Sequence, residues 1–219
     1  QDAISRQRAS QAEQTVQALA DVRADTSGDA LLAREAATNE ELSQYLLRAT
    51  AHLDTLTRRN QKVSQQLDAI NRSTAVIDEQ IGVLQGSVLL SRILLEQRRA
   101  LPAPVADAGL ADQIADIRLY QFEINKQREQ LTNPAAHAER LLAGAPAGEA
   151  DPTLREPLLA LLATRGELLE RLNRELNAVL AQSITLQLAE RQLLVSADRL
   201  RATLDKQMFW IPSNRPLDL

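Results

Sequence analysis

The chain has 219 residues, enough for one ordinary domain or two small ones, and carries a formal net charge of −4. It contains 38 Leu and 34 Ala, but only five aromatic residues and seven Gly. This composition nearly excludes β-sandwiches and β-barrels, whose strands need β-branched and aromatic residues, and almost every enzyme fold with Gly-rich βα turns. It is typical of an all-α protein in which long helices pack side by side.

The charge pattern and the apolar segments set further limits. No basic stripe marks a nucleic-acid footprint, so no nucleic-acid partner is predicted. The longest uncharged stretch, residues 176–189, is shorter than the roughly twenty apolar residues of a membrane-spanning helix. No export signal is recognisable at Gln1, which indicates a cytosolic chain or the mature or trimmed form of an exported one.

Residues 1–28 are polar and Gln-rich, and they predict a weakly ordered N-terminal helix that ends at Gly28. The first proline is Pro102, and a long helix is predicted over residues 30–100. From Leu46 onward this helix carries a heptad seam, which predicts a coiled coil. The seam consists of Leu46, Ala49, Leu53, Leu56, Asn60, Val63, Leu67, Ile70, Thr74, Ile77, Ile81, Leu84, Val88, Ser91 and Leu95.

Polar and small residues of this helix carry more specific predictions. Asn60 and Thr74 are polar seam positions, which we interpret as setting the register provided that a partner satisfies them. Residues 81–95 are apolar almost all round, so more than one partner helix is expected there. Gly82 and Gly86 lie off the seam, where another backbone can approach closely. The alternative is that they only loosen the helix, at about 1 kcal/mol each.

Prolines and glycines divide the rest of the chain. Pro102 and Pro104 end the long helix. The elements predicted next are a hairpin helix at about 109–132, a short helix at 135–142, a flexible loop at 143–151 and a long helix at about 153–208. The hairpin helix is expected to fold back antiparallel on residues 84–95. Residues 29–209 are therefore predicted to form an elongated antiparallel helical bundle, with the seam covered by the last helix or by another copy of the chain.

No constellation of catalytic or ligand-binding residues is apparent. His52 and His137 lack paired-ligand spacing, and the chain has no Cys, so a zinc or haem site has no ligand set. Adjacent carboxylates such as Asp78 and Glu79 point about 100° apart on a helix and are interpreted as a solvated face. The sequence therefore predicts no enzyme, no catalytic residue, no metal site and no cofactor.

Short motifs occur in a characteristic order between residues 78 and 218. They are LQGS at 84–87, LSRIL at 90–94, IADIRL at 114–119, QFEIN at 121–125 and ELL at 167–169, followed by FW at 209–210 and SNRPLD at 213–218. In this order they resemble the periplasmic region of the large MscS-type mechanosensitive channels, the MscK (KefA) group. The last two motifs resemble the segment that directly precedes the first transmembrane helix of those channels, so residues 210–219 are interpreted as a membrane-proximal linker.

The resemblance implies a domain on the periplasmic side of the bacterial inner membrane, excised from an ion channel that opens under tension during osmotic downshock. It implies that this chain is not itself the pore, and that its partners are the remainder of the channel and neighbouring subunits, with a membrane-surface contact at the C-terminus. Channels of the MscK group respond to potassium, but no residue here is assigned to that response. Coupling to the membrane is assigned to Phe209, Trp210, Pro212, Asn214, Arg215 and Pro216.

Two alternatives to this interpretation stay open. Phe209 and Trp210 are similar to an interfacial anchor, since amphipathic aromatic residues gather at the membrane boundary, but they equally fit a cap on the end of the bundle. The whole chain also fits a stand-alone coiled-coil envelope scaffold or adaptor with no channel attached. A reading frame that continues past Leu219 into several apolar stretches of about twenty residues would favour the channel.

Overall fold

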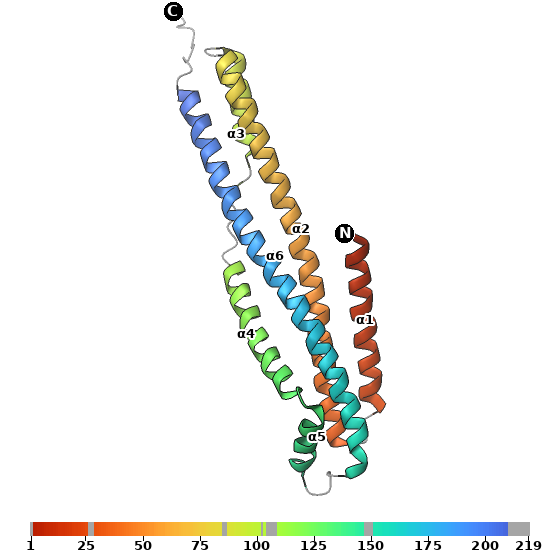
Figure 1. The fold of residues 1–219 in the computed structure, drawn as a ribbon. Coiled ribbons are helices and arrows are strands. Elements are labelled where there is room, and N and C mark those ends of the chain that lie inside the picture. Colours follow the sequence, from red (N-terminus) through yellow and green to blue (C-terminus); the bar gives the residue numbers. More distant parts are fainter. Residues whose placement is uncertain are drawn as a thin grey trace, which may run out of the picture. The chain divides into compact units, whose positions relative to one another are not determined.

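The computed structural model describes residues 2–25, 29–84, 87–101, 103, 109–146 and 151–209 of the chain. Helices account for nearly all of these residues, and no strand occurs among them (Figure 1). The elements are α1 (Asp2–Asp25), α2 (Ala30–Val83), α3 (Val88–Ala100), α4 (Gly109–Gln130), α5 (Pro134–Ala143), the short 3₁₀-helix η1 (Pro152–Leu154) and α6 (Arg155–Phe209). The all-α fold predicted from the composition is confirmed.

Polar side chains at the N-caps explain where several helices begin. The carboxylate of Asp29 accepts hydrogen bonds from the backbone amides of Leu31 and Leu32, at 3.0 and 3.2 Å. Asn133 caps α5 through a 3.1 Å hydrogen bond from the amide of Ala136. Each cap satisfies a backbone amide that the first helical turn leaves without a partner.

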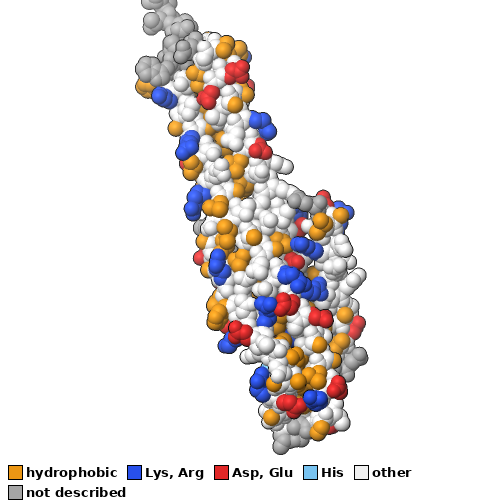
Figure 2. All heavy atoms as spheres, viewed as in Figure 1, with side chains coloured by type: hydrophobic (Ala, Val, Ile, Leu, Met, Phe, Trp, Pro, Cys, Tyr) orange, Lys and Arg blue, Asp and Glu red, His pale blue; other side chains and the backbone are white. Residues whose placement is uncertain are grey.

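The chain divides into two compact units, and α2 and α6 each contribute residues to both. Unit 1 comprises Gln1–Thr57 and Ala111–Ser183, and unit 2 comprises Arg58–Leu110 and Ile184–Leu219. Within the described part of the chain, no helix has an apolar stretch long enough to cross a membrane. On the face drawn in Figure 2, basic and acidic side chains are interspersed, and no extended patch carries one sign of charge.

In unit 1, α2 and α6 run in the same direction. The side chain of Asn39 in α2 contacts Leu161 in α6, and further along both helices Leu53 and Ala181 line one cavity. The short helix α5 packs against the starts of both helices. Their shared apolar cluster consists of Leu31, Leu32, Ala36, Ala138, Leu158, Leu161 and Leu162. Antiparallel neighbours therefore come from the shorter helices, not from the two long ones.

The helix α4 runs opposite to α6 within unit 1, and α1 runs opposite to α2 (Figure 1). Gln121 donates a 2.7 Å hydrogen bond to Asn177, and Arg128 forms a 2.6 Å ion pair with Glu170. The prediction that this hairpin helix packs on residues 84–95 is wrong. Residues 84–95 belong to unit 2, where α3 packs against α2 and α6, whereas α4 from Ala111 onward belongs to unit 1.

The predicted long helix is interrupted in unit 2. It ends at Val83 and a new helix begins at Val88, so the prediction of one helix over residues 30–100 is wrong. No proline marks the break. Instead, Ser87 adopts an extended backbone with ψ at 148°, and its Oγ accepts a 3.1 Å hydrogen bond from the amide of Leu90. A serine N-cap thus starts a helix where the seam alone predicts continuation.

After this break α3 folds back beside α2, and both pack with the last turns of α6 (Figure 1). The reversal changes which residues are buried: Leu90 is 4% exposed, whereas the predicted seam position Val88 is 75% exposed. The expectation that residues 81–95 are buried all round is wrong too, because Val83 is 75% exposed. The cluster that joins the three helices consists of Ile70, Ile77, Leu90, Leu94, Ala197, Leu200 and Leu204.

Upstream of the break, the heptad seam of α2 is buried or half-buried at every position from Leu46 to Ile81. The last long helix carries a matching buried stripe, so α6 covers the seam within the chain in each unit. The buried residues of this stripe are Leu158, Leu162, Leu169, Leu172, Leu176, Val179, Leu186, Ala197, Leu200 and Leu204.

Candidate functional site

Among the described residues, no three His, Cys, Asp or Glu side chains lie close enough together to hold a metal ion. Polar and aromatic side chains nevertheless come together at three places. Unit 1 contains a buried ionic cluster and a pair of stacked tyrosines. Unit 2 contains the end of α6, where the predicted coupling site begins.

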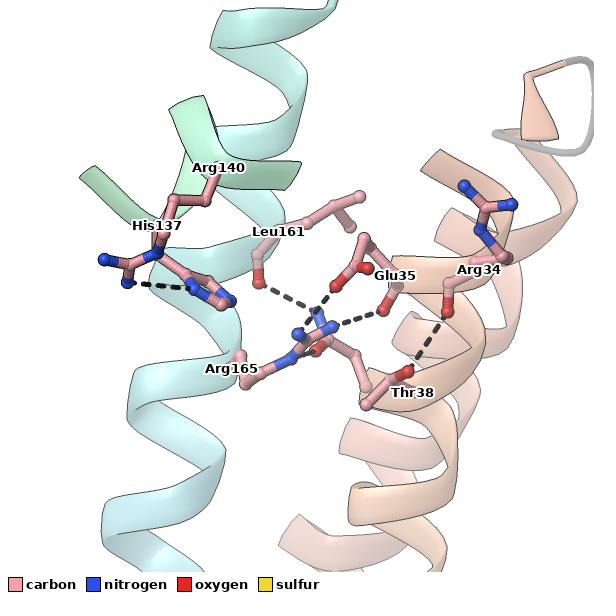
Figure 3. A network of polar contacts seen from close by, with 8 residues as sticks. Arg34, Glu35, Thr38, His137, Arg140, Leu161 and Arg165 are labelled. Atoms are coloured by element: carbon pink, nitrogen blue, oxygen red, sulfur yellow. Dashed lines mark hydrogen bonds and ion pairs between the residues drawn. The ribbon is translucent and has the colours of Figure 1, made fainter. Parts of the chain in front are cut away.

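The ionic cluster joins α2 to α6 (Figure 3). The guanidinium of Arg165 forms an ion pair with Glu35, with 2.6 Å between Nη1 and Oε2. It also donates hydrogen bonds of 2.9 Å to Asn39 Oδ1 and to the backbone oxygen of Glu35. Asn39, which is 0% exposed, donates from Nδ2 to the backbone oxygen of Leu161 at 2.9 Å. The side chains of the ion pair are only 9% and 13% exposed, so water screens their charges weakly.

Sequence reasoning missed this cluster, although the heptad spacing contains its signal. Counting back from Leu46 in steps of four and three places Asn39 and Glu35 on the seam of α2. Three residues after Leu162, Arg165 occupies a seam position of α6. Polar side chains on an apolar seam are buried and therefore need polar partners, and these three satisfy one another.

His137 of α5 lies beside the ionic cluster (Figure 3). Its Nδ1 is 3.5 Å from Nη2 of Arg140. The guanidinium can only donate, so this contact requires an unprotonated Nδ1 on the His137 ring. Burial lowers the pKa of His137 below its ordinary value of 6.5, and the positive charges of Arg140 and Arg165 lower it further, against the opposing effect of Glu35. The environment of α5 thus favours the neutral imidazole.

A tyrosine pair joins α2 to α4 in unit 1. The ring centroids of Tyr45 and Tyr120 are 3.8 Å apart with 22° between the planes, and Arg48 Cζ lies 5.4 Å from the centroid of the Tyr45 ring. Burial in the first place, and the neighbouring Tyr45 in the second, raise the pKa of Tyr120 to about 12. A cavity of about 170 Å³ adjoins the pair; its lining consists of Tyr45, Arg48, Ala49, His52, Ile117, Leu176 and Val179.

The predicted coupling site begins at the end of α6 in unit 2. Phe209 is the last helical residue, and it is 85% exposed. The preceding residue, Met208, packs against the apolar cluster of unit 2, and Asp205 forms a 3.0 Å ion pair with Arg98 of α3. The remaining predicted coupling residues lie outside the described part of the chain: Trp210, Pro212, Asn214, Arg215 and Pro216.

The structure also bears on the predicted packing and register positions. A Cβ placed on Gly82 would meet no heavy atom within 4 Å, so the close helix packing predicted there is wrong. Gly86 lies outside the described residues. Thr74 is half-buried, but its hydroxyl donates to the backbone oxygen of Ile70 in the same helix at 2.9 Å. Thr74 and the half-buried Asn60 stay proposed register positions.

Comparison with known proteins adds a family relationship, although no family model matches the chain. The chain is 37% identical over 220 residues to the mechanosensitive channel MscK of Escherichia coli, an alignment that covers all of this chain and 20% of that protein. It is 33% identical over 188 residues to an uncharacterized MscS family protein of Haemophilus influenzae, with coverage of 85% and 17%. The chain is homologous to these MscS-type proteins. It spans about a fifth of the length of the curated relatives it matches.

Homology to MscK confirms the resemblance on which the motif argument depends. It also extends that resemblance, because the motifs lie between residues 78 and 218 whereas the alignment with MscK covers the whole chain. Residues 1–77, whose sequence has only generic coiled-coil character, therefore belong to the homologous region as well. Both units, with the ionic cluster of the first and the reversed helix α3 of the second, lie within it.

Proposed function

We propose that this chain is a periplasmic structural and regulatory domain of an MscS-type mechanosensitive channel, and not the pore itself. The observation that carries the proposal is the alignment of the entire chain with about a fifth of MscK. In this proposal the partners are the remainder of the channel and the neighbouring subunits, and the channel protects the cell against osmotic downshock. No enzymatic activity is part of the proposal, since MscK is a channel.

Placement on the periplasmic side is supported by the motifs at residues 209–210 and 213–218. These resemble the segment that precedes the first transmembrane helix of the large MscS-type channels. The helix α6 ends at Phe209, directly before that segment. We therefore assign coupling between this domain and the membrane helix, together with a membrane-surface contact, to the membrane-proximal residues: Phe209, Trp210, Pro212, Asn214, Arg215 and Pro216.

The packing of unit 2 supplies a physical route for such coupling. The last turns of α6 are held by side chains that cannot move independently, because Leu200 and Leu204 are 2% and 0% exposed in a cluster with residues of α2 and α3. The ion pair between Asp205 and Arg98 adds a contact on the surface of the same turns. Since close-packed interiors transmit displacement, a change in the tilt of α3 would shift the end of α6 at Phe209.

Patch-clamp recording of the complete channel that carries this region tests the proposal. Trp210→Ala combined with Pro212→Ala should change the membrane tension at which the channel opens. The matched control is Leu188→Ala, at an exposed position of α6 in unit 2, and it should leave the threshold unchanged. An unchanged threshold in the double variant would remove the coupling role. A reading frame with no membrane helices beyond this region would instead support the stand-alone scaffold.

A further inference from the structure

We infer that unit 2 has a second membrane contact at the end of α2 and the start of α3, where apolar side chains insert into the headgroup region of a lipid bilayer. The side chains concerned are those of Val83, Val88 and Leu89, called the hairpin tip below. The inference rests on the proposed function, because it takes the end of α6 to lie next to the membrane. It adds a contact that is distant in sequence from the C-terminal segment.

The hairpin tip exposes apolar side chains on both sides of a connection whose own sequence is Leu-Gln-Gly-Ser. Connections between helices run over the surface and are usually rich in Gly, Asn, Asp and Ser. Here residues 80–91 include no charged residue. Val83 and Val88 are each 75% exposed and Leu89 is 55% exposed. Contact of these three side chains with water is unfavourable, and their grouping at one end of the two helices favours an interaction site there.

Loose packing of α3 does not explain this exposure. Leu90 and Leu94 of the same helix are 4% and 0% exposed, and Ser87 fixes the start of α3 through its cap. The first two residues of α3 therefore face away from a well-packed core. Their exposure is a property of the fold of unit 2.

The hairpin tip lies at the same end of unit 2 as the end of α6 (Figure 1). Leu84, which follows Val83, and Met208, which precedes Phe209, pack against the same apolar cluster. Figure 2 shows hydrophobic side chains gathered over the tip of the α2 and α3 pair. A membrane surface reached by Phe209 is therefore within reach of the hairpin tip.

A lipid surface fits the hairpin tip better than a protein partner does. A standard protein interface takes about 20–30 residues from each side, and three side chains fall far short of that. Shallow insertion into a bilayer needs no matching shape, only apolar side chains with no charge to desolvate. The nearest charged residues along the two helices, Glu79 and Arg92, are exposed and would stay at the aqueous boundary. They limit the insertion to the tip.

Fluorescence of single-cysteine variants tests the inference, since the chain contains no Cys. An environment-sensitive fluorophore is placed at Val88→Cys, and the labelled chain is mixed with vesicles of phosphatidylethanolamine and phosphatidylglycerol. The matched control is Leu188→Cys, also an exposed apolar position of unit 2, at 58%. We expect the label at residue 88 to shift to shorter wavelength and to be quenched by lipids brominated on their acyl chains. The control label should show neither effect.

Loss of the apolar side chains gives an independent measurement. Val83→Asp combined with Leu89→Asp should lower the partition coefficient for the same vesicles at least ~10-fold, because each change removes an aliphatic group that inserts into the bilayer and adds a charge. Both positions are exposed, so the fold is retained, and circular dichroism checks this. Leu188→Asp is the matched control and should bind as the unsubstituted chain does.

Each other outcome overturns the inference. A label at residue 88 that stays in water while vesicles are present removes the hairpin tip as a membrane contact. A spectral change without vesicles that grows with protein concentration removes it too, because a second copy then covers the tip. Fluorescence of Trp210, the only tryptophan, distinguishes this failure from failure of the proposed function. If Trp210 inserts into the vesicles and the label at residue 88 does not, the proposed membrane contact of the C-terminal segment is supported and the hairpin tip is not.

Discussion

Replacing Arg165 with leucine should destabilise unit 1 far more than removal of a surface ion pair, because it leaves two buried acceptors without their donor. Oε2 of Glu35 loses an ion pair of 2.6 Å, and Oδ1 of Asn39 loses a hydrogen bond of 2.9 Å. The side chain of Glu35 is 13% exposed and Asn39 is 0% exposed, so water reaches the first acceptor poorly and the second not at all.

The expected magnitude follows from these exposures. Breaking a buried ion pair by removing one partner costs about 3–5 kcal/mol, and an unsatisfied buried amide costs about 1–3 kcal/mol. The two costs overlap, because both acceptors lose the same guanidinium, and Glu35 keeps some contact with water. We therefore expect Arg165→Leu to lower the free energy of unfolding by about 3 kcal/mol.

Urea unfolding followed by circular dichroism measures this change. The matched control in unit 1 is Arg128→Leu, whose ion pair with Glu170 has side chains 34% and 52% exposed and should contribute about 0–1 kcal/mol. Glu35→Leu combined with Arg165→Leu should recover the part of the loss that comes from the unpaired carboxylate, whereas Oδ1 of Asn39 still lacks its donor. The reasoning fails if Arg165→Leu costs no more than the control, or if the two substitutions at the cluster simply add.

Three further predictions concern single groups. Since the pKa of His137 is depressed in the folded chain, its contribution to stability is present above pH 6.5 and is lost as pH falls below that value. The urea midpoint should therefore fall with acidification more in the unsubstituted chain than in His137→Gln. Since the pKa of Tyr120 is raised to about 12 from 10.0, its contribution to stability is present below pH 10 and is lost as pH rises to about 12. Absorbance of the phenolate measures this titration. Tyr45→Phe should lower the pKa of Tyr120. Ser87→Ala removes the cap of α3 and should cost about 1 kcal/mol, measured by urea unfolding, whereas Ser87→Asp, which keeps an acceptor, should cost less.

The heptad seam was predictable because it is a long-range average over many Leu, Ile and Val positions. The same average hides the break between α2 and α3. Because α3 folds back onto the cluster that α2 already fills, apolar residues recur at heptad spacing on both sides of the turn, at Leu84 and Val88, and mimic one unbroken helix. Proline, the usual sign of a helix end, is absent there, and a single Ser87 cap is a weak signal in sequence. The prediction that α4 packs on residues 84–95 assumes one unbroken helix over residues 30–100, so it fails together with that assumption.

The ionic cluster was not predictable by inspecting neighbouring residues, since Glu35 and Arg165 are 130 positions apart in the chain. Each of them lies on a seam whose other members are mostly apolar. A single charged residue on such a seam looks like an exception to the heptad pattern and does not by itself indicate a partner. Only the pairing of α2 with α6 in parallel brings the two charges together. That pairing depends on the reversal between α2 and α3 and on the reversal between α4 and α6, and the seam encodes neither.

The position of the cluster suggests why buried charges are kept in an otherwise apolar seam. A slip of α6 by one heptad along α2 keeps apolar residues opposite one another, so packing alone discriminates weakly between registers. The same slip would move the guanidinium of Arg165 from Glu35 and Asn39 to Leu42 and Leu46, where no acceptor is available. We infer that the cluster selects the register of α2 against α6 in unit 1.

Distances between spin labels at exposed positions of the two helices, Glu41→Cys in α2 and Ala163→Cys in α6, test this inference. A slip of seven residues displaces one label along the helix axis by about 10 Å, which such measurements resolve. The chain with its cluster intact should give one narrow distance. Glu35→Leu, Asn39→Leu and Arg165→Leu combined make the seam apolar at all three cluster positions, and this variant should add a second distance or broaden the first. If that variant stays folded with the same narrow distance, side-chain packing alone sets the register, and the buried charges are retained for another reason.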